Sequence, residues 1–135
     1  IVLLGGENIE PQVIESALRG SPYIETVVVM GQDKKYLAAL IVPAKESILM
    51  YAQENGLPVD SYEELLNNQQ IISLIRSEID SRICAEEGFR VCERIYRFAL
   101  LTESFTVGKE LSGKQEMMRH RIVDIYKKQI DTLFD

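Results

Sequence analysis

The sequence predicts an α+β domain: a small three-stranded, mostly antiparallel sheet packed with helices. Two short apolar runs rich in β-branched residues, 26–30 and 36–42, flank a turn and predict a β-hairpin. A third apolar run follows at 95–101. Stretches with apolar residues at helical spacing precede, separate and follow these runs, which is typical of helices packed on a sheet.

The first helix is expected over 10–19, and its apolar positions are Val13, Ile14, Ala17 and Leu18. Gly20 and Pro22 end this pattern. The hairpin that follows uses the polar segment 31–35 as its turn, and Pro43 closes its second strand.

Three helical segments are expected between the hairpin and the third strand. The first covers 46–55 and ends at Gly56, and the second is a short piece over 62–67. A longer amphipathic helix, broken by Gly88, has its apolar positions at Ile72, Ile75, Ile79 and Ile83. A single final helix follows the third strand, with one apolar face made by Met118, Ile122, Tyr126, Ile130 and Leu133.

Composition and charge exclude several classes of function. The 135 residues fit one domain, and 46% hydrophobic with 27% charged residues is ordinary for a globular protein. A net charge of −6 argues against a nucleic-acid interface and a polybasic membrane anchor. No apolar run approaches the roughly 18 to 20 residues of a membrane span. Cys84 and Cys92 are expected to be free thiols, and a single histidine, His120, offers no zinc ligand set, so no bound metal is expected.

One motif looks like a phosphate-binding loop without being one. The segment 108–114 fits the pattern G-x-x-x-x-G-K, but Gln115 follows where a P-loop has the Ser or Thr that holds magnesium. A P-loop also belongs to a parallel βαβ sheet, whereas only one helix follows this segment. We therefore interpret the match as coincidence.

The opening residues contain a more specific pattern. An apolar strand stub, Ile1–Leu4, leads into a Gly-Gly bend, and Pro11 stands near the start of a helix. Without a leader or a start methionine, the sequence is expected to be cut from something larger. The run Gly5–Pro11, "GGENIEP", resembles the "GGENIxP" loop that opens the small C-terminal domain of adenylate-forming acyl-CoA synthetases, the AMP-binding ligases of the ANL superfamily.

Two further segments resemble the same family and stand in the expected order. Tyr36–Pro43, "YLAALIVP", fits its central hairpin, and Phe98–Thr106, "FALLTESFT", resembles the strand before the catalytic-lysine loop of long-chain acyl-CoA synthetases. The resemblance covers essentially the whole chain. It identifies residues 1–135 as the C-terminal swinging, or lid, domain of a long-chain fatty acid–CoA ligase, with the N-terminal adenylation domain absent.

The resemblance implies a reaction in two steps. Such ligases join a carboxylate to ATP to give an acyl-adenylate and pyrophosphate, then rotate the C-terminal domain and pass the acyl group to the thiol of CoA. ATP, CoA and Mg²⁺ then belong to the parent enzyme, and the isolated domain is expected to be inactive and to bind none of them tightly. The implied partners are the adenylation domain, a fatty acid and CoA in the cytoplasm, without nucleic acid or a transmembrane segment; peripheral membrane association stays open.

The resemblance also implies a lysine that stabilises the charge developing during adenylation. Lys114, in the run Ser112–Lys114, resembles the "SGK" of the acetyl and medium-chain branches and is the candidate. A gap-free comparison with the long-chain branch places Glu116 there instead, so the assignment needs a two-residue shift. We favour the shift because a carboxylate cannot replace an ammonium group. Lys109 is the next candidate on reach alone, and Lys114 as an ordinary solvated lysine is the remaining alternative.

Gly5, Gly6 and Glu7 are expected, from the same resemblance, to line the CoA tunnel, because a backbone without side chains can closely approach the pantetheine arm. The simpler interpretation is a bend that feeds a helix, with Glu7 and Glu10 near the helix N-terminus, and both interpretations are compatible. Two other functions stay open. One is the lid domain of an adenylating enzyme that acylates a carrier protein, and the other is a regulatory or interaction module.

Overall fold

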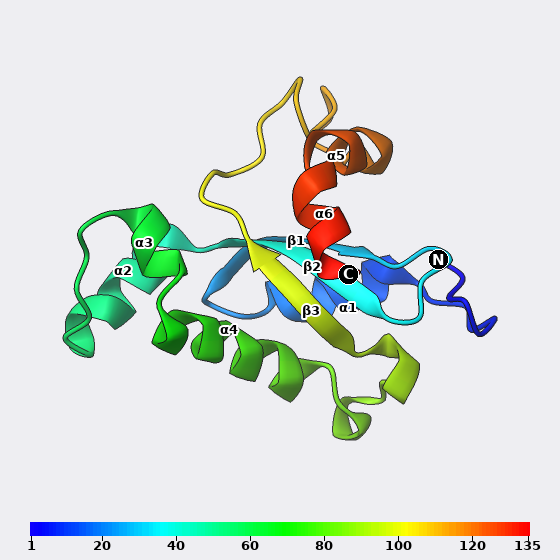
Figure 1. Cartoon of the computed structure of the whole chain (residues 1–135), viewed down its shortest axis with the longest axis horizontal. Helices are drawn as coiled ribbons and strands as arrows, with labels where there is room; N and C mark the ends of the chain where they lie inside the picture. The colour runs from blue at the N-terminus through cyan, green and yellow to red at the C-terminus, as the bar shows by residue number, and fades with distance from the viewer.

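The structure, a computed structural model, describes residues 1–135 and contains one three-stranded sheet surrounded by helices (Figure 1). The strands are β1 (Ile24–Met30), β2 (Leu37–Pro43) and β3 (Ile95–Leu100), and the helices are α1 (Pro11–Arg19), α2 (Lys45–Glu54), α3 (Tyr62–Leu66), α4 (Gln69–Arg82), α5 (Arg119–Ile125) and α6 (Lys127–Leu133), with two short 3-10 helices, η1 (Ala85–Glu87) and η2 (Val91–Glu93). None of the helices combines the length and the apolar character needed to cross a membrane. The α+β fold class predicted from the sequence is confirmed.

The strand order is β1-β2-β3, and the central strand β2 is buried along its whole length. β2 pairs antiparallel with β1, with Leu40 opposite Val28, so the expected hairpin is confirmed. It pairs parallel with β3, with Ala39 opposite Phe98, so the sheet is mixed rather than mostly antiparallel. The reason lies in the connection: α2, α3 and α4 form a helical crossover that starts β3 at the same end of the sheet as β2.

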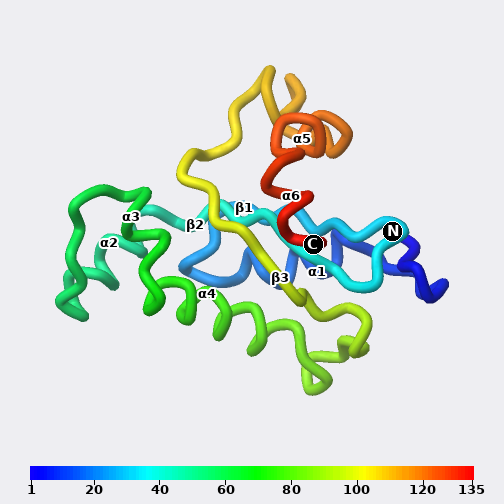
Figure 2. The backbone as a smooth tube through the Cα atoms, in the orientation of Figure 1, coloured from blue at the N-terminus to red at the C-terminus, as the bar shows by residue number.

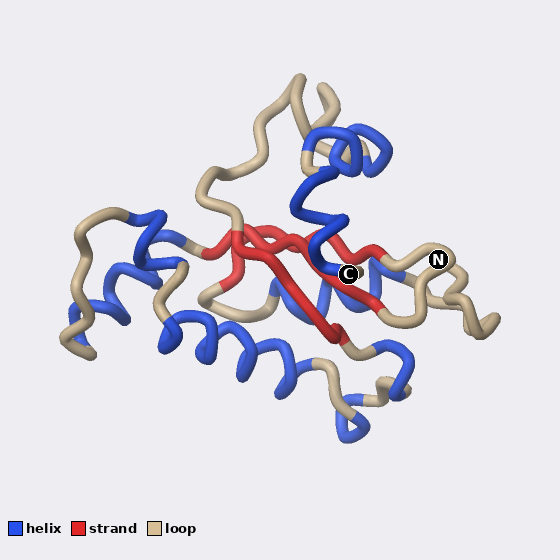
Figure 3. The backbone as a smooth tube through the Cα atoms, viewed as in Figure 1, coloured by secondary structure: helices blue, strands red, loops and turns tan.

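Helices cover both faces of the sheet (Figure 3). Successive side chains of β1 alternate between these faces, as a strand geometry requires. Val27 and Val29 belong to the core cluster that includes α1 and α4, whereas Val28 and Met30 belong to the cluster that includes α5 and α6. The C-terminal helices are therefore anchored to the opposite face of the sheet from the helix that follows the N-terminal loop.

The final helix, expected as one element, is divided into α5 and α6 at Tyr126. The backbone of this residue leaves helical geometry, with φ −104° and ψ 23°. The buried Ile122, Ile130 and Leu133 confirm the expected apolar face. The hydroxyl of Tyr126 donates to the carboxylate of Glu110, which lies 16 residues earlier, so a remote contact is located at the break.

Helix α4 ends earlier than its predicted break at Gly88. It ends at Arg82, because Ile83 leaves helical geometry while its side chain is buried in the core. Gly88 instead follows η1 in a left-handed conformation, with φ 88°. The segment beyond α4 contains the two cysteines, which are free thiols as expected.

Candidate functional site

The glycine loop, defined here as residues 1–9, folds back on itself as a tight hairpin. Its two arms form an antiparallel bridge. The N–H of Leu3 donates to the carbonyl of Glu7 at 3.0 Å, and the N–H of Gly6 donates to the carbonyl of Leu3 at 2.9 Å. Gly6 has a φ of +91°, a region that favours glycine because other residues have a Cβ that clashes there. The tip of the loop, residues 4–7, is exposed.

Gly5 has a different steric environment from Gly6. A Cβ added to Gly5 would lie only 2.5 Å from Oε1 of Glu7, whereas a Cβ on Gly6 would meet nothing within 4 Å. Gly5 therefore leaves room for the carboxylate of Glu7, and Gly6 supplies the backbone conformation. The structure brings the three predicted residues of this loop together, with the Glu7 carboxylate lying against the backbone of Gly5.

The glycine loop is tied to its surroundings mainly through the backbone. Two hydrogen bonds of 2.8 and 3.0 Å join it to the turn between β1 and β2. Arg90, which precedes η2, donates from Nη2 to the carbonyl of Asn8 at 2.7 Å. A cavity of about 730 Å³ opens beside the loop, and its walls include Leu3, Glu7, Tyr36 and Tyr96. The loop is thus fixed at its base and open to solvent at its tip.

The candidate lysine lies at the tip of a second hairpin, the lysine hairpin (residues 111–117). Figure 2 follows the chain from β3 through a long loop to this hairpin and on to α5. An antiparallel bridge joins the end residues of the hairpin, and two backbone hydrogen bonds of 2.8 Å cross its turn. Gln115 closes the turn with a φ of +63°, the left-handed position that usually holds glycine in three-residue turns. Lys114, just before it, is exposed, and its ammonium group has no ion-pair partner.

The other two candidates in this loop have different surroundings. Nζ of Lys109 lies 3.9 Å from Oε2 of Glu110, so this lysine is already paired. Glu116 is exposed on the returning arm of the hairpin. The lysine that projects unpaired from the turn is therefore Lys114.

The G-x-x-x-x-G-K match is not a P-loop in this fold. A P-loop wraps its backbone around a phosphate directly before a helix. Here Gly113 and Lys114 of the motif lie in the lysine hairpin, and α5 begins only at Arg119. The preceding strand β3 ends at Leu100, well before the motif begins. The interpretation of this match as coincidence agrees with the structure.

Glu110 fixes the base of the lysine hairpin. It is 1% exposed, and it accepts hydrogen bonds from the N–H of Thr106 at 3.1 Å and from the hydroxyl of Tyr126. Burial alone would raise the pKa of Glu110, but the hydrogen bonds from Tyr126 and Thr106 outweigh it and hold the pKa below its ordinary value. Burial and the Glu110 carboxylate raise the pKa of Tyr126. The pair therefore joins an ionised carboxylate to a neutral phenol at neutral pH.

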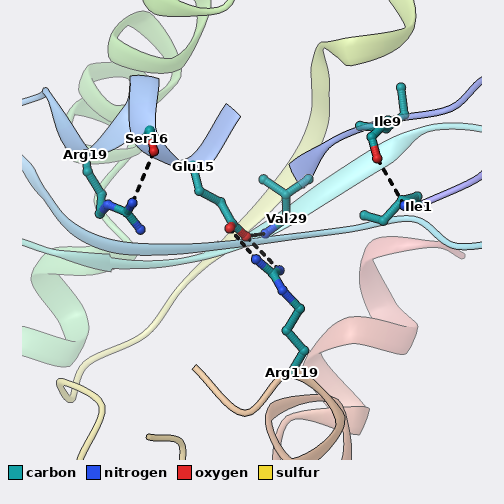
Figure 4. A network of polar contacts seen from close by, with 7 residues as sticks. All are labelled: Ile1, Ile9, Glu15, Ser16, Arg19, Val29 and Arg119. Carbon is teal, nitrogen blue, oxygen red and sulfur yellow. Dashed lines mark hydrogen bonds and ion pairs between the residues drawn. The ribbon is translucent and has the colours of Figure 1, made fainter. Parts of the chain in front are cut away.

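A second buried carboxylate lies beyond the other end of the hairpin (Figure 4). Glu15, on α1, is 1% exposed and accepts a hydrogen bond from the N–H of Val29 at 2.8 Å. It also binds both terminal nitrogens of Arg119, with an Nη1–Oε2 distance of 2.9 Å. One carboxylate thus connects α1, the edge strand β1 and the start of α5.

Sequence reasoning did not identify the buried contacts of Glu15, Glu110 and Arg119; it placed Arg119 only on the polar face of the last helix. Glu15 offered a signal, because it stands among the apolar residues Ile14 and Leu18 on the buried side of α1, where a charge requires a partner. The other two offered none. Their partners lie 16 and 104 residues away in sequence, and no local pattern reports such pairs.

Known proteins resemble this chain along its whole length. Residues 1–135 match the family described as AMP-binding enzyme C-terminal domain. Probable acyl-activating enzyme 16, chloroplastic, of Arabidopsis thaliana is 33% identical over 99% of this chain, which covers 18% of that protein. Long-chain-fatty-acid–CoA ligase 1 of Cavia porcellus is 30% identical over 98% of this chain, which covers 19% of it. The chain thus spans about a fifth of the length of these relatives.

Solved structures agree with the sequence relatives. The adenylation domain of a carboxylate reductase from Mycobacterium chelonae superposes with a TM-score of 0.78 at 25% identity, over 99% of this chain and 19% of that chain. The corresponding domain from Segniliparus rugosus, in complex with AMP and a carboxylic acid, gives a TM-score of 0.79 at 23% identity over the same shares. The resemblance seen in the sequence is therefore confirmed, and the chain belongs to the family of AMP-binding enzyme C-terminal domains, a domain of adenylate-forming enzymes.

Proposed function

We propose that the chain is the lid domain of a fatty acid–CoA ligase, which makes an acyl-adenylate from a fatty acid and ATP and passes the acyl group to CoA. One observation carries the proposal: the chain matches the family over residues 1–135 and presents an exposed, unpaired Lys114 at the tip of a hairpin. In this proposal the domain works with an upstream adenylation domain in the cytoplasm, and the fatty-acid pocket lies outside this chain.

Lys114 is proposed to act in the first step. An oxygen of the fatty-acid carboxylate attacks the α-phosphorus of ATP, the bond to pyrophosphate breaks, and negative charge builds on the α-phosphoryl oxygens. An ammonium group placed against those oxygens stabilises the transition state more than the substrates. Lys114 has no partner to leave before it reaches another domain, whereas Lys109 would first have to separate from Glu110.

The glycine loop is proposed to act in the second step, when the CoA thiol attacks the acyl carbonyl and AMP leaves. An arm as narrow as pantetheine can pass close to a backbone that lacks side chains. Gly5 and Gly6 supply such a surface at an exposed tip. Glu7 would lie beside the arm, since its carboxylate rests against Gly5.

Magnesium has no assigned place in this chain. The domain contains no group of three or more histidine, cysteine, aspartate or glutamate side chains that could hold a metal ion. We therefore assign the Mg²⁺ that accompanies ATP to the upstream domain, and neither of the two proposed roles depends on it. We propose that the isolated domain is inactive.

The test is a comparison of Lys114→Ala with Glu116→Ala in the longer enzyme that contains this domain. We expect fatty acid-dependent pyrophosphate exchange to fall about 10²- to 10³-fold for Lys114→Ala, the usual loss of one transition-state donor. Glu116→Ala is the matched control, since it shortens a neighbouring side chain of the same hairpin, and its rate should stay within about twofold of the wild type. Unchanged exchange for Lys114→Ala would refute the assignment of this lysine.

A carrier protein as the acyl acceptor is the second candidate. One relative favours it: long-chain-fatty-acid–[acyl-carrier-protein] ligase AEE15, chloroplastic, of Arabidopsis thaliana is 31% identical over 99% of this chain, which covers 16% of that protein. The two acceptors are distinguished by supplying the full enzyme with CoA or with a phosphopantetheinylated carrier protein. If thioester forms only on the carrier protein, the carrier replaces CoA as the proposed acyl acceptor, and the proposed adenylation step is unchanged.

A further inference from the structure

We propose that Arg119, held by Glu15, is a positioning residue for Lys114 and links the lysine hairpin to the helix that follows the glycine loop. The inference deepens the proposed function and rests on it for its activity measurements. The inference is argued from the two contacts between the Arg119 guanidinium and the Glu15 carboxylate, which Figure 4 shows.

The lysine hairpin is short, and both of its ends are fixed. At one end the buried Glu110 binds Thr106 and Tyr126, and its carbonyl accepts the N–H of Met118 at 2.9 Å. At the other end Arg119 binds Glu15. A hairpin held at both ends has a defined direction, so these anchors determine where its tip points.

The Glu15–Arg119 contact is suited to positioning. A guanidinium that binds both oxygens of a carboxylate is fixed in its plane, whereas a single-point contact is free to rotate. Glu15 cannot follow a moving arginine, because it is buried and also bound to the N–H of Val29 at 2.8 Å. Arg121, two residues further along the chain, has no such anchor. It makes only an exposed contact of 3.4 Å to the carbonyl of Gly108.

Direct packing between α1 and the hairpin does not replace this contact. A polar cavity of about 470 Å³ lies between them, walled by Gln12 and Ser16 from α1 and by Gln115 and Met117 from the hairpin. Glu15 and Arg119 also border this cavity, where their ion pair crosses from one element to the other. The side of the hairpin that faces α1 is therefore held by an ion pair rather than by an apolar interface.

The same pair relates the two candidate surfaces to each other. Helix α1 begins directly after the glycine loop, and α5 begins directly after the lysine hairpin. In Figure 1 the glycine loop and the segment before α5 lie on different sides of the domain. Joining α1 to α5 makes the two surfaces parts of one rigid unit, so a rotation that removes one surface from an active site also carries the other by a fixed amount.

The experiment is a double-mutant cycle on the full-length enzyme. Pyrophosphate exchange is measured for Arg119→Met, Lys114→Ala and the double variant. Arg19→Met is the matched control, because this exposed arginine of α1 borders the same cavity but donates its side-chain hydrogen bond to Ser16 and not to Glu15. A small displacement of a catalytic group costs up to about 10²-fold. We expect Arg119→Met to lower kcat at least about tenfold, with KM for ATP within about twofold, and to have almost no further effect when Lys114 is already alanine.

Three results of the cycle would overturn the inference: a normal kcat for Arg119→Met, an undiminished effect in the Lys114→Ala background, or normal exchange by Lys114→Ala itself. If Arg119→Met does not fold, the double variant Glu15→Gln/Arg119→Met takes its place, because it leaves no unpaired buried charge. A glutamine at this position can still accept the N–H of Val29.

A second measurement tests the inference without depending on activity. If the full-length protein adenylates no fatty acid, the proposed function is refuted, but this measurement still decides the inference. Hydrogen exchange of the backbone amides of Ser112 and Gln115, both bonded across the hairpin turn, is compared in the same variants. Exchange accelerated at least about tenfold in Arg119→Met but not in Arg19→Met supports the inference. Equal exchange in both variants overturns it.

Discussion

The glycine loop and the lysine hairpin have a similar backbone shape but are stabilised by different interactions. Both are tight hairpins with one left-handed residue, Gly6 at φ +91° and Gln115 at φ +63°. The glycine loop is fixed largely by backbone hydrogen bonds, within itself and to the β1–β2 turn. The lysine hairpin depends on two buried carboxylates, Glu15 and Glu110, whose partners come from elsewhere in the chain. The exposed tip of the glycine loop therefore depends on backbone geometry, and its buried Leu3 and Ile9 depend on apolar packing, whereas the lysine hairpin depends on buried carboxylates.

The largest difference between the two regions should appear when an ion-pair partner is removed. Arg119→Met leaves the Glu15 carboxylate buried without its counter-ion. Breaking a fully buried pair costs about 3 to 5 kcal/mol. Because the Arg119 side chain is 36% exposed, we expect a smaller loss, about 2 kcal/mol, in the free energy of unfolding measured with urea.

The neutral pair Glu15→Gln/Arg119→Met is the control for this loss. It should recover more than half of the lost stability, since no charge stays buried. A double variant as unstable as Arg119→Met would mean that packing of the arginine, rather than its charge, stabilises this region.

A substitution in the glycine loop should cost less and should act through the backbone alone. Gly6→Ala forces a Cβ into a left-handed conformation, and we expect a loss of roughly 1 to 2 kcal/mol in the free energy of unfolding. Gly113→Ala is the matched control in the lysine hairpin. Gly113 has neither a positive φ nor an atom within 4 Å of an added Cβ, so its replacement should be nearly neutral. Equal losses for both variants would contradict the conformational role of Gly6.

The same contrast explains what the sequence could predict. The β1–β2 hairpin and the bend at Gly6 follow from local patterns, a β-branched run and a Gly-Gly pair, and both are present. The parallel pairing of β3 depends on a crossover of three helices, and the break at Tyr126 lies at a contact with Glu110, so neither could be predicted from local spacing. In the candidate site, the family resemblance pointed to Lys114 and the glycine loop, whose roles stay predictions. It did not point to the Glu15–Arg119 pair, because a partner 104 residues away leaves no local signal.

The smallest effect is expected at the extremes of pH, through Glu110 and Tyr126 at the base of the lysine hairpin. The pKa of Glu110 lies below its ordinary value of 4.5. Its contribution to the free energy of unfolding is therefore present above about pH 4.5 and is lost as the pH falls through the lowered pKa. The pKa of Tyr126 lies above its ordinary value of 10. Its contribution to the free energy of unfolding is therefore present below about pH 10 and is lost as the pH rises through the raised pKa.

Urea unfolding from pH 3 to 7 and from pH 7 to 11 measures these two contributions. Glu110→Gln should flatten the acid side of the stability curve, and Tyr126→Phe should flatten the alkaline side. An acid side that is unchanged by Glu110→Gln would show that other carboxylates dominate it.

We propose that the two hairpins serve different half-reactions, which is tested by measuring both steps in two variants of the full-length enzyme. Lys114→Ala should lower adenylation about 10²-fold or more and leave thioester formation from supplied acyl-adenylate within about threefold. Gly5→Ala, which moves the Glu7 carboxylate without forcing a strained φ, should do the reverse. Opposite effects are expected if the two hairpins serve different half-reactions; a loss of the same step in both variants would show that they serve one.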